Sequence, residues 1–227
     1  MLTKNTLEFL KNLADNNNRD WFAEHRAAYD SAKKEFEKLI QEILVGVNTF
    51  EALPNTHVKD CIFRINRDIR FSKDKAPYKQ WLSAAIGPGG RHSGRIDYYL
   101  HIQPNNESFL GAGMWNPTPK QLAKFRQEID FNAQELKAII DQPTFKAYFP
   151  AIWGDVLQRP PKGYSEEHPD IDLLKRKQMF FMHKYTDAEV LDKPFGQEVV
   201  AGCKLIKPYC DLLNYLFYDE EDELTSL

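Results

Sequence analysis

The clearest pattern in the chain is a helical stripe in its first quarter. Seven apolar residues recur every three or four positions over about five turns, which places them on one face of a helix: Tyr29, Ala32, Phe36, Leu39, Ile40, Ile43 and Val47. A shorter stripe of the same kind follows Asn5 and Glu8, whose spacing is typical of a capping box. Both patterns predict amphipathic helices at the start of the chain.

The period changes to two in the middle of the chain. Across residues 61–71 apolar and polar residues alternate, which predicts a strand. Residues 81–86, 96–103 and 108–115 are further strand candidates, and Asn105-Asn106-Glu107 is a turn signal between the last two. We therefore expect an antiparallel sheet here.

Capping signals predict further helices in the second half. Thr118 and Gln121, with a proline between them, predict the start of one helix, and Thr186 with Glu189 predicts the start of a helical C-terminal third. Within that third, Pro208 is expected to kink a helix or to begin a new one.

Helices at both ends of a central, mostly antiparallel sheet make α+β the predicted fold class. Weaker strand candidates at residues 152–158 and 178–185, with a short helix near residues 170–176, fit this class. No internal repeat or linker is evident, so we predict a single domain over residues 1–227. The acidic run at residues 219–227 is expected to form a frayed tail.

Composition and cysteine spacing narrow the class of protein. The chain is 42% hydrophobic and 28% charged, which is typical of globular proteins and excludes a disordered or collagen-like chain. Its 3 cysteines lack a CxxC spacing, so we interpret them as reduced core thiols. No signal peptide or long apolar stretch is present, so we expect a soluble cytoplasmic protein without a membrane partner.

Positive charge is concentrated in residues 64–79. This segment has six basic and two acidic residues, hence a net charge of +4, in a chain whose total is -3. The rest of the chain therefore carries a net charge of −7. Because like charges repel, acidic residues from elsewhere or a bound anion should balance the segment.

Strand geometry predicts two environments within this segment. Residues two positions apart share a face, which aligns four polar side chains: Arg64, Asn66, Asp68 and Arg70. On a neighbouring strand, Tyr99, His101 and Gln103 would share a polar face, opposite to Leu100 and Ile102.

Arg67 falls on the opposite, apolar face and therefore needs a partner. A helix carboxylate such as Asp20, Glu24 or Asp30 would make it structural, whereas a bound phosphate would make it functional. The sequence leaves both possibilities open.

The same residues carry a resemblance to a known family. The pattern Arg64-x-x-Arg67-Asp68-x-Arg70-Phe71-x-x-x-Lys75-x-x-Tyr78 resembles the signature of the uncharacterised family catalogued as domain of unknown function 2461. Segments elsewhere are also similar to that family's pattern: Asn16-Asn17, Asp20-Trp21-Phe22, His101-Ile102-Gln103-Pro104, Gly111-Ala112-Gly113, Trp115-x-Pro117, Pro161-Lys162-Gly163-Tyr164 and His168-Pro169. The resemblance implies a widespread soluble protein of about this length, and it brings no known reaction, cofactor or catalytic residue.

We expect the basic segment to bind a small anionic ligand that carries phosphate or carboxylate. The residues expected to hold the anion are Arg64, Arg67, Arg70, Lys75 and Lys162, because guanidinium and ammonium groups pair with such anions. If the site is enzymatic, Asp68, Tyr78 and His101 are the candidates for proton transfer.

Two other classes of function stay open. The arginine and aspartate residues could instead form a structural network in a module that recognises a protein partner, or the segment could bind nucleic acid, which the net charge disfavours. The spacing of the histidines predicts no metal site, and no motif names a cofactor. Gly111 and Gly113 fit either close approach to a ligand or a twisted hairpin.

Overall fold

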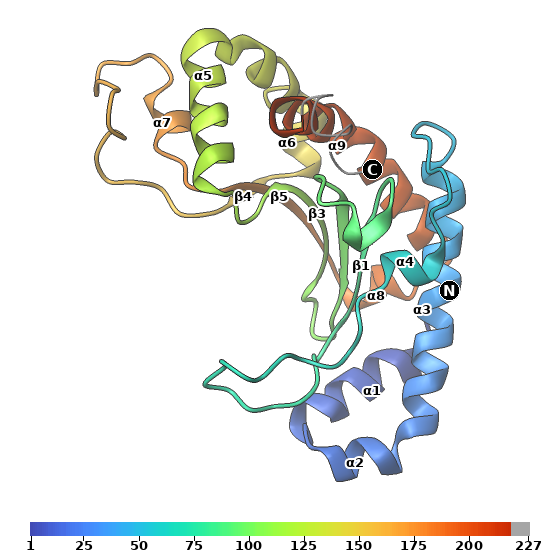
Figure 1. Cartoon of the computed structure of the whole chain (residues 1–227). Helices are drawn as coiled ribbons and strands as arrows, with labels where there is room; N and C mark the ends of the chain where they lie inside the picture. The colour runs from blue at the N-terminus through green and yellow to red at the C-terminus, as the bar shows by residue number, and fades with distance from the viewer. Residues whose placement is uncertain (219–227) are drawn as a thin grey trace. The chain divides into compact units, whose positions relative to one another are not determined.

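The computed structural model describes residues 1–218 and has the predicted α+β fold (Figure 1). One antiparallel sheet contains five strands in the order β1-β2-β3-β5-β4. The strands are β1 (Leu82–Ile86), β2 (Tyr98–Ile102), β3 (Ser108–Met114), β4 (Ala151–Trp153) and β5 (Met179–Tyr185). The acidic tail predicted at residues 219–227 lies outside the described residues.

The chain forms two compact units. The first contains Met1–Leu110 and Lys184–Lys204, and the second contains Gly111–His183 and Leu205–Leu227. The divisions therefore fall within strands β3 and β5 and within the last helix, α9 (Phe195–Phe217). That the whole chain folds as a single domain stays a prediction.

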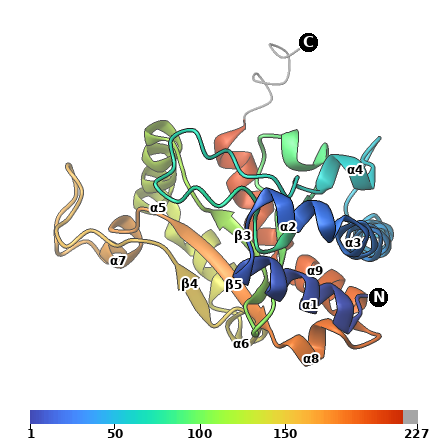
Figure 2. The ribbon, with the colours of Figure 1, turned by 90° about the horizontal axis from the view of Figure 1, so that it is seen from below.

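The helices of the first unit confirm both amphipathic patterns at the start of the chain. They are α1 (Lys4–Asp15), α2 (Arg19–Glu24), α3 (Arg26–Val47), α4 (Val58–Cys61) and α8 (Asp187–Val190). Figure 2 shows α3 almost end-on, with α1 and α2 near it. The apolar stripe of α3 is buried, including Phe36, Ile40 and Ile43.

The first turn of α1 is stabilised by a distant residue. The predicted capping box of Asn5 and Glu8 is wrong, because the N-cap is Thr3 and its side chain makes no capping hydrogen bond. Instead, Glu35 on α3 accepts hydrogen bonds from the Thr3 backbone N–H (2.9 Å) and the Thr6 hydroxyl (2.6 Å). A tertiary contact thus satisfies the backbone N–H of the N-cap residue, which the third helical residue satisfies in a local capping box.

The pairing of β1 with β2 separates an apolar face from a polar one. Leu82 lies opposite Ile102 and Ala84 opposite Leu100, and these four side chains are buried in the core. Ser83 lies opposite His101 on the other face. The predicted alternation along residues 96–103 is therefore confirmed.

The second unit confirms the capping signal at Thr118. The Thr118 hydroxyl accepts a hydrogen bond from the Gln121 backbone N–H (3.2 Å), and α5 (Pro119–Ile140) begins there. Two short helices follow, α6 (Pro143–Tyr148) and α7 (Ile171–Leu174). The last helix, α9 (Phe195–Phe217), runs through Pro208 without ending, so the expected new helix at this proline does not form.

Two glycines of β3 lie where side chains would collide with β5. A Cβ on Gly111 would meet the Phe181 carbonyl oxygen at 2.7 Å, and one on Gly113 would meet the Met179 carbonyl oxygen at 2.5 Å. Close packing between strands therefore accounts for both glycines.

The structure confirms the interpretation of the cysteines as core thiols. Cys61, Cys203 and Cys210 are buried and free. In residues 1–218, no helix has both the length and the apolar character needed to cross a membrane.

Candidate functional site

The basic segment forms a hairpin, defined here as residues 62–81, that projects from β1 and β2 (Figure 1). The strand predicted over residues 61–71 does not form, because its pairing is limited to isolated bridges such as Asn66 with Tyr78. Two backbone hydrogen bonds join the legs, from Arg67 N–H to the Pro77 carbonyl (2.9 Å) and from Lys79 N–H to the Ile65 carbonyl (2.8 Å). The predicted alternation survives locally, since Ile65 is buried while Arg64 and Asn66 are exposed.

The base of the hairpin is anchored to the helices of the first unit. The Asn17 side chain donates to the Tyr78 carbonyl (2.9 Å) and accepts from the Tyr78 backbone N–H (3.1 Å). The Tyr78 ring is only 9% exposed and stacks on Phe22, with 4.0 Å between ring centroids. Tyr78, a candidate for proton transfer, is therefore placed as an anchor.

Replacing Asn17 with alanine should loosen the hairpin. The loss of both hydrogen bonds is expected to lower the free energy of unfolding by about 1–3 kcal/mol, and trypsin should cut the hairpin faster. Asn16→Ala is the matched control, because the Asn16 side chain is exposed and bonds only to its own helix, at the Asn12 carbonyl. Equal effects of the two substitutions on urea unfolding and trypsin cleavage would contradict the anchor.

Arg67 finds its partner inside the hairpin. Its Nη1 lies 2.5 Å from Asp74 Oδ2 and donates to the Ala76 carbonyl at 3.1 Å, and the side chain is 25% exposed. The helix carboxylates considered as partners, Asp20, Glu24 and Asp30, do not pair with it, and Asp30 pairs with Arg26 instead. Arg67 therefore stabilises the turn of the hairpin.

Arg70 and Asp68 form a second local pair. Arg70 donates through Nε to Asp68 Oδ1 (3.0 Å) and through Nη2 to Oδ2 (2.7 Å). These hydrogen bonds lower the pKa of the exposed Asp68 carboxyl, so it remains ionised and bound to its arginine. Asp68 thus orients Arg70, and its lowered pKa makes it a weak proton acceptor.

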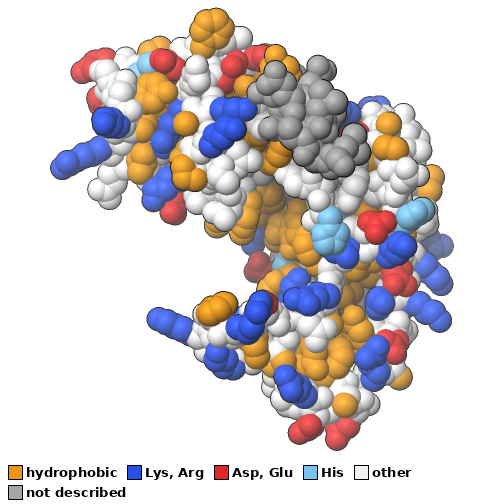
Figure 3. Space-filling view, viewed as in Figure 1, with side chains coloured by type: hydrophobic (Ala, Val, Ile, Leu, Met, Phe, Trp, Pro, Cys, Tyr) orange, Lys and Arg blue, Asp and Glu red, His pale blue; other side chains and the backbone are white. Residues whose placement is uncertain are grey.

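Among the residues that the structure describes, four cations of the hairpin have no carboxylate partner: Arg64, Lys73, Lys75 and Lys79. Lys75 donates to the Ile69 carbonyl at 3.0 Å, whereas Arg64 and Lys73 make no hydrogen bond with any described residue. Figure 3 shows blue Lys and Arg side chains gathered over the projecting hairpin. The excess positive charge of the sequence is thus unbalanced within the hairpin.

Where the two ends of the hairpin meet the sheet, aromatic rings cover the polar face of β1 and β2. We call this cluster the aromatic face, and its members are Phe63, Trp81, Tyr99, His101 and Phe109. The His101 ring stacks on Phe109 (4.7 Å between centroids) and on Trp81 (5.2 Å). All members except His101 are half-buried, so parts of the rings remain accessible.

Hydrogen bonds hold both ring nitrogens of His101. Nε2 donates to Gln103 Oε1 at 2.9 Å, which leaves Nδ1 to accept from the Tyr99 hydroxyl at 3.4 Å. Burial is the main cause that lowers the pKa of His101, so the ring is neutral at pH 7. In this arrangement His101 is a flat stacking surface, and both nitrogens are occupied.

Lys79 links the hairpin to the aromatic face. Its ammonium lies 5.1 Å from the centroid of the Phe63 ring, within cation–π distance. Burial, followed by the positive charge of Arg64, lowers the pKa of Lys79. A bound anion near Lys79 would relieve both effects, because it would supply the missing negative charge.

Trp81 contributes a buried donor to the same face. Its indole N–H lies near the Tyr99 hydroxyl, yet it makes no hydrogen bond of normal length and angle with the described part of the chain. An acceptor atom of a ligand could satisfy this donor, whose isolation costs about 1–3 kcal/mol.

One further sequence candidate, Lys162, belongs to the second unit, where it is exposed in a turn.

Comparison with known proteins identifies the family. Residues 5–212 match the family model described as "Conserved hypothetical protein (DUF2461)". The chain belongs to this family. No curated protein and no solved structure matches the chain.

Membership in DUF2461 confirms the resemblance seen in the sequence, and the match includes the hairpin and the aromatic face. The sequence signals did not place Trp81 or Phe109 at His101, because only strand pairing brings these rings together. They also missed Asn17, whose partner Tyr78 is 61 positions away.

Proposed function

We propose that this DUF2461 protein binds a small molecule in which a flat ring is joined to a phosphate or carboxylate group. The observation that carries the proposal is the aromatic face with the Lys79 ammonium beside it. A flat ring gains free energy by stacking on such rings, and the anion gains by contact with a partly desolvated cation. Arg64, which has no ion-pair or hydrogen-bond partner within residues 1–218, adds the second positive charge.

The pairing of charges assigns different roles to the arginines of the hairpin. Arg64 and Lys79 would contact the anion, whereas Arg67 and Arg70 hold the hairpin in shape through Asp74 and Asp68. Lys75, whose ammonium donates to a backbone carbonyl, would contribute long-range attraction to the anion.

The neutral His101, with both ring nitrogens hydrogen-bonded, supports a binding role for the site. The buried free thiols favour the cytoplasmic location expected from the sequence.

A matched set of probes tests the proposal. Adenosine 5′-monophosphate carries both parts, adenosine only the ring and ribose 5-phosphate only the anion. We expect calorimetry to show saturable binding of the monophosphate, with at least about tenfold weaker binding of each fragment, since each loses one contact worth roughly 1.4 kcal/mol.

Single substitutions test which residues bind the monophosphate. Trp81→Ala, Lys79→Met and Arg64→Ala should each weaken binding of the monophosphate about tenfold, whereas the surface control Lys38→Met should not. Equal binding by wild type and Trp81→Ala would rule out the aromatic face. Tighter binding of a single-stranded oligonucleotide, lost steeply between about 50 and 200 mM salt, would favour the nucleic-acid alternative instead.

A further inference from the structure

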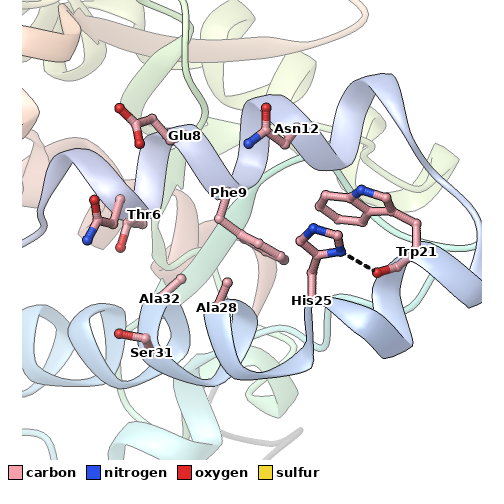
Figure 4. Close-up of a pocket in the computed structure, with 10 residues that line it drawn as sticks. Thr6, Glu8, Phe9, Asn12, Trp21, His25, Ala28, Ser31 and Ala32 are labelled. Carbon is pink, nitrogen blue, oxygen red and sulfur yellow. Dashed lines mark hydrogen bonds between the residues drawn. The ribbon is translucent and has the colours of Figure 1, made fainter.

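A second candidate site lies among the three N-terminal helices. A cavity of about 290 Å³ opens between α1, α2 and α3, and Figure 4 shows the side chains that line it. Its floor is apolar, formed by Phe9 from α1 and by Ala28 and Ala32 from α3. Every lining residue belongs to the first unit, and none belongs to the aromatic face.

One wall of the cavity is a stacked pair of rings. Trp21 and His25 lie 4.0 Å apart between centroids, with only 12° between their planes. His25 Nδ1 donates to the Trp21 backbone carbonyl at 2.8 Å, the bond that is dashed in Figure 4. In the neutral ring this leaves Nε2 as a hydrogen-bond acceptor. The stack is therefore held in a fixed orientation by its own backbone.

The rim of the cavity is polar and lacks internal partners. Asn5, Glu8 and Asn12 from α1 and Ser31 from α3 contribute side chains to it, and none of these side chains bonds to another described residue. Thr6 differs, because its hydroxyl already donates to Glu35. The unused donors and acceptors surround an apolar floor, as in many small-molecule sites.

The charge of the lining selects the class of ligand. Among the described residues that line it, Glu8 is the only carboxylate, none is a lysine or arginine, and His25 is the other titratable side chain. An anion would meet Glu8 without a compensating cation, whereas an ammonium group would form a charge-assisted hydrogen bond with it.

We propose that this cavity binds a small organic ammonium compound, a primary amine attached to a flat apolar group. The ammonium pairs with Glu8, and the apolar group lies on Phe9, Ala28 and Ala32 against the ring stack. Its volume is at the lower end of the range for ligand pockets, about 300–1,000 Å³, so the ligand is of single-ring size. The proposal is independent of the aromatic face, where the positive charges of Lys79 and Arg64 favour anions.

Three probes of nearly equal shape test the charge selection: 2-phenylethylamine, 2-phenylethanol and 3-phenylpropionate. In a titration followed by amide NMR of the whole chain, we expect the amine to bind saturably and to shift amides of α1, α2 and α3. The alcohol should bind at least about fivefold more weakly, and the carboxylate should cause no shift there. Amine shifts confined to other parts of the chain, or equal binding of all three probes, would overturn the proposal.

Paired variants separate binding from folding. Glu8→Gln should weaken the amine about tenfold, while Asp15→Asn, on the same helix but outside the lining, should leave its affinity unchanged. Ala28→Phe should fill the cavity and abolish binding, while Ala27→Phe should not, since both alanines are exposed and only Ala28 lines the cavity. Unaltered affinity in Glu8→Gln or in Ala28→Phe would refute the site.

Discussion

Gly113→Ala is expected to lower the free energy of unfolding by about 3 kcal/mol. Gly113 has a φ of 122°, which alanine adopts only under strain, and its missing Cβ faces the Met179 carbonyl at 2.5 Å and the Tyr209 ring at 2.7 Å. The Tyr209 hydroxyl donates to that same carbonyl at 2.7 Å. A methyl group at Gly113 must therefore displace a buried ring, a strand and their hydrogen bond together.

Gly163→Ala separates this crowding from backbone strain. Gly163 also has a positive φ, 97°, but nothing lies within 4 Å of its ideal Cβ. Only the strain of about 1–2 kcal/mol should remain. Urea unfolding of the two variants measures the difference, and equal losses of stability would show that the packing against β5 and Tyr209 contributes nothing.

A second large effect on the free energy of unfolding is expected from the ionisation of Asp97 as the pH changes. Burial is the main cause that raises the pKa of this carboxyl from 3.8 to about 7, and the nearby Glu51 adds to the rise. Its Oδ2 accepts from the Ser93 hydroxyl at 2.7 Å, whereas its buried Oδ1 has no partner among the described residues. Ionised Asp97 is therefore costly in the folded state.

The sign of the effect follows from proton binding. Between pH 4 and pH 7 the folded state keeps the Asp97 proton and the unfolded state releases it, so stability falls as the pH rises through this window. The total loss is at most about 4 kcal/mol, and it is complete above the folded pKa.

Asp97→Asn removes this titration. The variant should be more stable than wild type by about 2–4 kcal/mol at pH 8, and the advantage should shrink as the pH falls toward 4. Urea unfolding at several pH values measures it, with the exposed Asp15→Asn as control. A difference between Asp97→Asn and wild type that stays constant with pH would contradict the raised pKa.

Local patterns in the sequence determined much of the hairpin. Its alternation of exposed and buried positions survives in the structure without a regular strand, because an extended backbone alternates its side chains whether or not it is fully paired. Both arginine–aspartate pairs join residues within seven positions of one another. Such contacts depend on the local turn, and the sequence showed the residues but not which of them pair.

The aromatic face could be predicted only in part. The alternation in β2 showed that Tyr99 and His101 share a face, since a strand has a period of two. That Trp81 and Phe109 stack on His101 depends on the register of separate strands. Register arises from pairing between segments, which no local pattern contains.

By itself, the sequence determined the helices with strong apolar stripes and the α+β class, because these rest on periodicity along each segment. It also determined the family and the excess positive charge of the hairpin, because these rest on the residues present in a segment. Only the tertiary structure decided which charges remain unpaired. Arg67 is satisfied by Asp74, whereas Lys79 lies at the aromatic face, close enough to Arg64 to feel its charge, and neither pairs with a carboxylate of residues 1–218. Pairing depends on distances between side chains, and the folded backbone sets those distances.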